Sequence, residues 1–475
     1  MLPASLDEEG VGGLSRDVCW PLEPLIFGRR EMMNDDEQSR RDGMPLRLAR
    51  LAALEPGEVR AFLWSFAYFF ALLCSYYIIR PLRDEMGIAG GVDKLQWMFT
   101  GTLLAMLATV PFFGWVAKRF PVERFLPYVY YFFIANLILF FALFKSEIAH
   151  AYVARGFFIW VSVFNLFIVS IFWSFMADVF NNDQAKRLFG IIAAGGTAGA
   201  LTGPVLTAAL VKELGTASML LISAAFLAVA VLCIHRIIAW KNSTRSAFSQ
   251  GRRGPGAGPD LGGDQPIGGS TLAGIRLVLS SSYLGGICLL ILFYTTLSTF
   301  LYFQQAQIVR DSFDHPASRT ALFAAIDFSV NLITVLTQLA ATSRIVRKIG
   351  VSWTLALIPL LLMIGFLLLG IMPTLSVLIV IQVLRRAGNY AVMRPAREML
   401  YVVLSKEEKY KAKNFIDTFI YRGGDALSAW AYAGLKAAGM TLASTALIAV
   451  PLSALWAWIA FGLGRRQTEL GRQNV

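Results

Sequence analysis

Apolar stretches, each long enough to cross a lipid bilayer, occupy most of the chain between Arg60 and Gly464. A transmembrane helix needs roughly 20 apolar residues, and about twelve such stretches can be laid out along this sequence. Of the 475 residues, 56% are hydrophobic and only 16% are charged, which no soluble globular class accommodates. We therefore predict an all-α membrane protein without room for a sizeable soluble domain.

Charged and Gly/Pro-rich breaks divide the apolar stretches into two sets of six. The predicted helices are 60–80, 95–116, 125–145, 152–179, 187–211 and 216–239, then 283–305, 319–341, 351–371, 374–400, 413–436 and 440–463. Between the sets lies a Gly/Pro-rich segment that cannot form a packed core. The predicted organisation is a polar, disordered tail (1–57), a six-helix bundle (58–241), a flexible linker (242–275), a second six-helix bundle (276–466) and a short tail (467–475).

Lysine and arginine concentrate in the short loops on one side of this layout. Examples are Lys118, Arg119, Arg124, Arg344, Arg347, Lys348, Lys406, Lys409 and Lys411. Such loops lie on the cytoplasmic side of membrane proteins, so we predict that both termini and the linker are cytoplasmic. The net charge of +12 is then explained by these loops, and no nucleic-acid partner is predicted.

Cysteine and histidine are sparse and dispersed, at Cys19, Cys74, Cys233, Cys288, His150, His235 and His315. Their spacing predicts neither disulfides nor a metal site. The sequence also lacks a phosphate-cradling Gly-x-x-x-x-Gly-Lys loop and a nucleophile elbow. We therefore predict no cofactor and no enzymatic activity.

Ionisable residues inside membrane segments are costly unless they face protein or a wet cavity, which makes them the candidate functional residues. At the end of the first helix, Tyr76, Arg80 and Arg83 share one helical face, and Asp84 follows. The alternative interpretation is that both arginines extend to the lipid headgroups and pair with adjacent acids.

The tenth helix repeats the Arg-Pro-x-Arg-acid string of the first helix. Its chemistry-bearing residues are Arg385, Arg386, Tyr390, Arg394, Arg397 and Glu398. Arg386, Tyr390, Arg394 and Arg397 share one face, and apolar sequence on both sides of Arg385 and Arg386 places them too deep to reach headgroups easily. Pro81 and Pro395 are each predicted to interrupt their helix, as in many transporter sites.

Acidic residues in or beside the helices are candidates for charge compensation or proton coupling. They are Asp84, Asp178, Asp327 and Glu398, and Asp425 is expected to pair with Arg422 within its helix. Asp327 starts a polar stripe on the eighth helix that continues through Asn331, Thr334 and Gln338, which favours a cavity lining over lipid exposure.

Glycines in the fifth helix follow a small-xxx-small spacing, at Gly195, Gly199 and Gly203 with Gly196 beside them. This pattern predicts close helix packing in preference to a ligand site.

Arginine forks suit phosphate oxygens and stay charged when partly buried, so the arginine-rich helices predict a polyanionic substrate. Neighbouring Tyr76 and Tyr390 offer flat faces on which a base can stack.

Six plus six helices with a long central loop resemble the architecture of the major facilitator superfamily, in which substrate binds between the two halves. More specific strings start at Tyr77 (YIIRPLRDEMG), Phe172 (FWSFMAD), Ala185 (AKRLFG) and Tyr410 (YKAKNFID). These strings resemble the bacterial and plastid ATP:ADP antiporter family. The resemblance implies exchange of a nucleotide triphosphate for a diphosphate across the cell inner membrane, and it adds Lys186 to the predicted substrate-binding residues.

Two other functions stay open at this stage. One is proton-coupled transport of another organic anion, with Asp178 or Asp327 titrating, and the other is a nontransporting membrane sensor or scaffold. The predicted partners are membrane lipids and an anionic small molecule, with a nucleotide as the first candidate. A monomer is compatible with the sequence.

Overall fold

A computed structural model describes residues 58–119, 122–146, 148–251, 278, 281–405, 408, 412–413 and 415–473. All regular structure in these residues is helical, and the chain from Leu54 onward forms one compact unit. The predicted tail 1–57 and most of the predicted linker lie outside the described residues.

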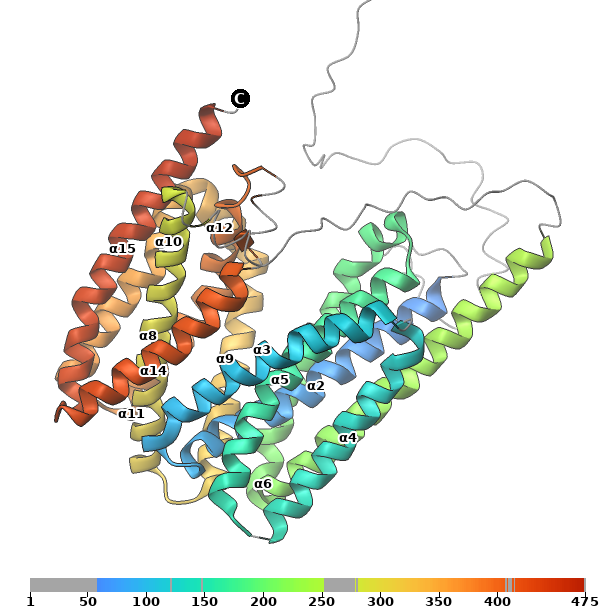
Figure 1. Cartoon of the computed structure of the whole chain (residues 1–475), viewed down its shortest axis with the longest axis horizontal. Coiled ribbons are helices and arrows are strands. Elements are labelled where there is room, and N and C mark those ends of the chain that lie inside the picture. The colour runs from blue at the N-terminus through green and yellow to red at the C-terminus, as the bar shows by residue number, and fades with distance from the viewer. Residues whose placement is uncertain are drawn as a thin grey trace, which may run out of the picture. The chain divides into compact units, whose positions relative to one another are not determined.

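The first set of helices runs from blue to green in Figure 1. It comprises α2 (Val59–Ala89), the short η2 (Val92–Lys94), α3 (Leu95–Arg119), α4 (Val122–Ser146), α5 (His150–Val179) and α6 (Asn182–Gly251). Within α6, Gly215 adopts φ 80° and ψ 161°, a left-handed backbone conformation that ends one helix and starts the next. Counted in this way, the first set contains six long helices.

The second set runs from yellow to red in Figure 1. It comprises α8 (Ser282–Ser312), α9 (Pro316–Ala340), α10 (Thr342–Ile371), α11 (Leu375–Gly388), α12 (Arg394–Met399), α14 (Tyr421–Ala437) and α15 (Leu442–Gln473). A π-helical turn, Asn389–Met393, joins α11 to α12, and a second π-helical turn, Ile416–Ile420, leads into α14. The α11–α12 pair therefore forms one membrane segment, and the second set also contains six.

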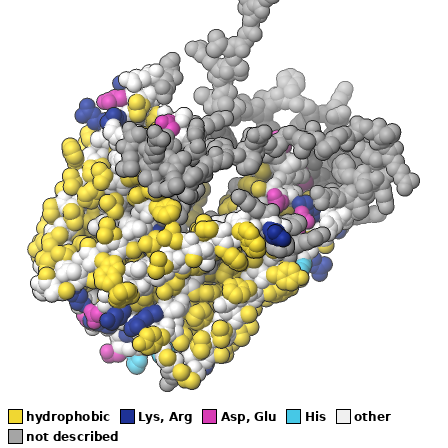
Figure 2. Space-filling model, in the orientation of Figure 1, with side chains coloured by type: hydrophobic (Ala, Val, Ile, Leu, Met, Phe, Trp, Pro, Cys, Tyr) yellow, Lys and Arg dark blue, Asp and Glu magenta, His cyan; other side chains and the backbone are white. Residues whose placement is uncertain are grey.

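Ten helices in the described part of the chain are long and apolar enough to cross a membrane. One of them is α6, which supplies two crossings because of the break at Gly215, and α14 with its π-helical turn adds another. The total is then the predicted twelve. Figure 2 shows hydrophobic side chains over most of the visible helical surface, with charged side chains gathered toward its ends. The chain is a multi-pass membrane protein.

The first helix is longer than the prediction of 60–80, because α2 continues to Ala89. Arg80 and Arg83 therefore lie inside the helix and not at its end. Pro81 is accommodated within a continuous α2, so the predicted interruption there is wrong. A proline removes one backbone donor without ending α2 here, and the charged side chains on both sides of Pro81 are paired within the protein.

Two hydrophobic cores support the two sets of helices. One is built from α2, α4, α5 and α6, and the other mainly from α8 to α15 with the adjoining ends of α2 and α3. A glycine stripe seats α6 on α2, since a Cβ atom on Gly199 would lie 2.3 Å from the carbonyl oxygen of Phe70. A Cβ atom on Gly195 would lie 2.6 Å from the carbonyl oxygen of Phe66. This confirms the predicted close packing through these glycines.

Candidate functional site

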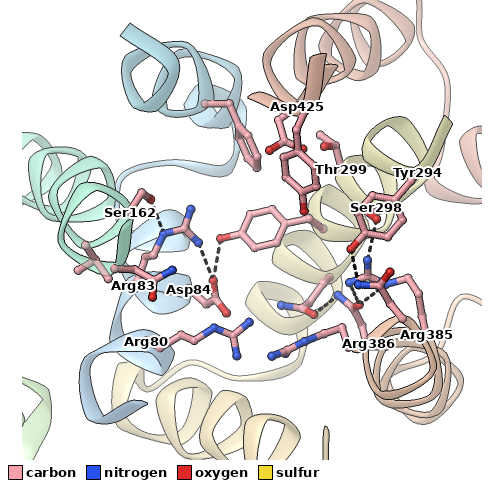
Figure 3. A pocket seen from close by; sticks show the side chains of 18 of the residues that line it. Arg80, Arg83, Asp84, Ser162, Tyr294, Ser298, Thr299, Arg385, Arg386 and Asp425 are labelled. Atoms are coloured by element: carbon pink, nitrogen blue, oxygen red, sulfur yellow. Dashed lines mark hydrogen bonds and ion pairs between the residues drawn. The ribbon is translucent and has the colours of Figure 1, made fainter. Parts of the chain in front are cut away.

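Two adjoining cavities lie between the two sets of helices. The inner cavity has a volume of about 260 Å³ and is shown in Figure 3. Its lining includes seven of the predicted site residues, Tyr76, Arg80, Arg83, Asp84, Arg385, Arg386 and Tyr390. The structure thus brings together residues from helices that are about 300 positions apart in the sequence.

The outer cavity, of about 610 Å³, adjoins the inner one. Six residues line both cavities, namely Asn165, Tyr294, Asn389, Tyr390, Tyr421 and Arg422. Two further predicted residues, Arg394 and Arg397, line only the outer cavity. The predicted arginines of the tenth helix are therefore divided between the cavities, with the deeper pair in the inner one.

Asp327 on α9 links arginines from both sets of helices. Its Oδ1 atom accepts hydrogen bonds from Arg80 on α2 and from Arg386 on α11, the latter at 2.6 Å. Asp327 is 1% exposed. In Figure 3 the guanidinium groups of Arg80 and Arg386 point toward each other. Asp327 therefore compensates part of the charge of both arginines across the interface between the two sets.

The charge of Arg83 is compensated by its sequence neighbour. Arg83 donates to the Oδ1 atom of Asp84 at 3.3 Å and to the hydroxyl of Ser162 at 3.0 Å. The same Asp84 atom accepts a hydrogen bond from the hydroxyl of Tyr302, on the second set, at 3.1 Å. These contacts, drawn in Figure 3, fix the Arg83 guanidinium against the cavity wall.

Among the described residues, only neutral groups accept hydrogen bonds from the Arg385 side chain. Its Nε and Nη2 atoms donate to the Gln382 amide oxygen at 3.2 and 2.8 Å, and its Nη1 atom donates to Ser298 at 2.7 Å. Gln382 in turn donates to the amide oxygen of Gln305. Arg385 is only 7% exposed, so a fixed, buried guanidinium faces the cavity without a carboxylate partner.

Two of the three remaining cavity arginines, Arg397 and Arg422, form ion pairs within the second set. Arg422 pairs with Asp425 at 3.4 Å, which confirms the intrahelical pair expected from the sequence. Arg397 lies 3.7 Å from Asp417.

Taken together, seven arginines and four aspartates line these cavities or bond to their lining, which gives a net formal charge of +3. The space therefore favours an anionic ligand.

Both π-helical turns lie at the cavities. Tyr390 belongs to the Asn389–Met393 turn, and Tyr421 directly follows the Ile416–Ile420 turn. A π-helical turn changes the direction of the following side chains, and such turns are frequent at functional sites. The helix geometry is thus interrupted immediately before Pro395, where an interruption was predicted.

One end of the interface between the two sets is closed by polar contacts. Arg319 pairs with Glu85 at 2.7 Å, and Lys436 pairs with Asp93 at 2.8 Å. The indole of Trp430 donates to Thr100 at 3.0 Å. The inner cavity begins next to this end, and the outer cavity extends away from it along α3.

Four predicted residues are outside the lining of both cavities, and one of them, Asp327, bonds to the lining residues Arg80 and Arg386. Lys186 is exposed near the start of α6 and pairs with Asp183 at 3.3 Å. Asp178 is exposed at the end of α5, and Glu398 pairs with Lys413 at 2.5 Å. No group of three or more potential metal ligands occurs within the described ranges.

Several residues that shape the site were not predicted from the sequence. They are Ser162, Asn165, Tyr294, Ser298, Tyr302, Gln305 and Gln382. A usable signal was present in Gln305 and Gln382, because amide side chains inside apolar membrane segments need a polar partner.

The sequence profile of the Major Facilitator Superfamily matches residues 61–396 of the chain. A search of curated protein sequences gives no significant match.

Solved transporter structures resemble the chain in fold. An auto-inhibited peptide transporter of the POT family is 15% identical, with a TM-score of 0.57 over 86% of this chain and 97% of that one. The nucleoside transporter NupG is 14% identical, with a TM-score of 0.54 over 86% and 99%. A bacterial homolog of the human lysosomal transporter Spinster, in an inward-facing and unoccupied conformation, is 13% identical, with a TM-score of 0.53 over 88% and 99%.

Proposed function

Because this chain belongs to the Major Facilitator Superfamily and is a membrane transporter of that type, we propose that it exchanges phosphorylated organic anions by alternating access. The specific reaction that the sequence resemblance implies is exchange of ATP for ADP across the cell inner membrane. The two sets of helices rock about the central cavities, which bind one anion at a time.

The observation that carries the proposal is the buried charge of Arg385. Burying a cation without a counter-charge costs several kcal/mol, and Arg385 has only neutral partners among the described residues. A bound anion supplies the missing counter-charge. Arg385 is already fixed by Gln382 and Ser298, so little side-chain entropy is lost when the anion binds.

The surplus of charge favours a phosphate group over a carboxylate. A phosphate ester carries up to two negative charges, and a diphosphate carries about three, which matches the net formal charge of +3 around the cavities. Guanidinium groups also bind phosphate oxygens in a bidentate manner. The tyrosines Tyr76, Tyr294 and Tyr390 provide aromatic faces for the organic part of the substrate.

The closed end is assigned to the outer face of the membrane. This assignment rests on the cationic loops, from which we predict that both termini are cytoplasmic. The contacts between Arg319 and Glu85 then form the gate at the outer face of the membrane. The cavity called outer above lies on the opposite side of the inner cavity and leads toward the cytoplasm.

The test is uptake of labelled ATP into proteoliposomes preloaded with ADP, orthophosphate or buffer alone. We expect uptake to require internal ADP, and we expect Arg385→Gln to reduce it at least a hundredfold. Arg310→Gln is the matched control, because Arg310 is exposed and pairs with its neighbour Asp311. Uptake independent of internal anion, or full activity in Arg385→Gln, contradicts the proposal.

A second candidate function is proton-coupled transport of another organic anion. It is favoured by Asp327, because protonation of this one carboxylate removes ion pairs to both sets of helices at once. An imposed pH gradient across the same proteoliposomes distinguishes it from exchange. Uphill uptake driven by the gradient, and lost in Asp327→Asn, supports proton coupling.

A further inference from the structure

The outer cavity has two chemically different walls. The second set of helices supplies Arg394, Arg397 and Arg422 together with Asp417. The first set supplies the aliphatic and aromatic side chains of Leu103, Met106, Leu107, Val110, Leu166 and Phe167, and the polar side chains of Asn165 and Ser170 on α5. A ligand in this cavity therefore meets cations from the second set and, along α3, an apolar surface from the first.

The apolar wall is a continuous helical face. Leu103, Met106, Leu107 and Val110 follow one another at the 3–4 residue spacing of one face of α3. Leu104, on another face of the same helix, is 61% exposed on the outside of the helical set. The α3 helix thus presents apolar side chains toward the cavity as well as away from it.

The α3 face of this wall fits the organic part of a nucleotide poorly. A nucleobase carries donors and acceptors along its edges, and aliphatic side chains leave such groups without hydrogen-bond partners. A hydrocarbon chain makes no such demand, and it gains from removal from water in proportion to its buried area.

We propose that the preferred substrate is an anionic amphiphile, a phosphate monoester of an aliphatic chain. Its phosphate binds among the inner arginines, next to Arg385, and its chain lies along the apolar face of α3. The proposal rests on the proposed anion site, and it changes the expected organic part from a nucleoside to a hydrocarbon. A nucleotide is then the weaker ligand of the same arginines.

The test is a series of ligands with one headgroup and increasing chain length. Orthophosphate, ethyl, butyl, hexyl and octyl phosphate are titrated calorimetrically into the full chain in lipid nanodiscs, and heats from empty nanodiscs are subtracted. We expect the affinity to rise roughly two- to fourfold for each methylene group that reaches the apolar wall. Octyltrimethylammonium, with the same chain and the opposite charge, is expected not to bind, and ADP is expected to bind more weakly than octyl phosphate.

Two leucines on α3 make a matched pair of variants. Leu107→Ser alters the cavity wall and is expected to lower the ratio of octyl to ethyl phosphate affinity at least fivefold. Leu104→Ser makes the same change on the exposed face of α3 and is expected to keep the wild-type ratio.

The possible results separate this inference from the proposed function. Binding of phosphate with no dependence on chain length, or tighter binding of ADP than of octyl phosphate, overturns the amphiphile and leaves the anion site intact. Equal binding of octyl phosphate and octyltrimethylammonium also overturns it. Absence of binding across the whole series, with the protein shown to be folded, overturns both proposals.

Discussion

Arg319 on α9 donates hydrogen bonds to both carboxylate oxygens of Glu85 on α2, at 2.7 Å from Nε and 2.8 Å from Nη2. Glu85 is fully buried, and the side chain of Arg319 is 11% exposed. The pair joins the two sets of helices through a bidentate contact, in which each guanidinium nitrogen donates to one carboxylate oxygen. It therefore links the two sets at the closed end of the interface through two charge-assisted hydrogen bonds.

Glu85→Gln is expected to open this end. Removing one partner of a buried ion pair costs about 3–5 kcal/mol, because the other charge is left uncompensated. Separation of the two sets lets water reach Arg319, so the open population is expected to rise at least tenfold. The measurement is labelling of Thr100→Cys by a membrane-impermeant maleimide, in a background with the native cysteines replaced by serine, since Thr100 contacts Trp430 across this end.

Arg310→Gln serves as the control for this opening. Arg310 lies in the last turn of α8 and pairs with the adjacent Asp311, and both side chains are exposed. We expect Thr100→Cys to be labelled at the same rate with and without the Arg310→Gln substitution. A Glu85→Gln protein that labels at the wild-type rate contradicts the assignment of this pair as a gate.

Asp327→Asn is expected to strengthen anion binding and to weaken the fold. It raises the net formal charge around the cavities from +3 to +4, and one unit charge at about 10 Å and an effective dielectric constant of about 20 amounts to about 1.7 kcal/mol. Affinity for orthophosphate is therefore expected to rise more than tenfold. Because Arg80 and Arg386 then repel each other unopposed, the melting temperature is expected to fall.

Asn331→Ala is the matched comparison for Asp327→Asn. Asn331 lies one turn further along α9, is buried, and donates to the carbonyl oxygen of Ala200 at 2.8 Å. Its removal is expected to lower the melting temperature without any gain in phosphate affinity. Calorimetric titration measures the affinity for orthophosphate, and thermal unfolding measures the melting temperature. Weaker phosphate binding in Asp327→Asn than in the wild type contradicts the prediction and means that Asp327 does more than compensate charge.

The sequence predicted which helix faces carry charge more reliably than it predicted which charges pair. Helical spacing placed Tyr76, Arg80 and Arg83 on one face, and all three line the inner cavity. The bridge from Arg80 through Asp327 to Arg386 depends on how three helices rotate about their own axes, which spacing within one helix does not fix. Pairing across the interface therefore required the structure.

The neutral ligands of Arg385 illustrate a different limit. Ser298 and Gln382 are uncharged, and hydroxyl and amide groups occur throughout these apolar segments. A hydroxyl in a membrane helix commonly bonds to its own backbone, as Thr334 does with Val330 at 2.6 Å. Nothing in the sequence distinguishes Ser298, which fixes an arginine, from such backbone-bonded hydroxyls.

Gly199→Ala is expected to destabilise the first set of helices. The added Cβ atom would lie 2.3 Å from the carbonyl oxygen of Phe70 and 2.9 Å from the backbone nitrogen of Cys74, so α2 and α6 have to move apart. Such overpacking costs about 1–3 kcal/mol, which lowers the melting temperature by several degrees. Gly190→Ala, in the same helix with nothing within 4 Å of the new atom, is expected to keep or slightly raise it. Equal melting temperatures for the two variants contradict the packing role of Gly199.

Lys186→Gln is expected to leave transport unchanged within about twofold, although the family resemblance included Lys186 among the substrate-binding residues. Its side chain is 77% exposed and pairs with Asp183, which is 88% exposed, and an exposed pair of this kind contributes about 0–1 kcal/mol. Arg386→Gln is the comparison, because Arg386 lines the inner cavity and is expected to be required for uptake. Both variants are measured by initial uptake rates in the same proteoliposomes. A loss in Lys186→Gln as large as that in Arg386→Gln means that the start of α6 reaches the substrate in another state of the transport cycle, which would extend the binding site beyond the two cavities.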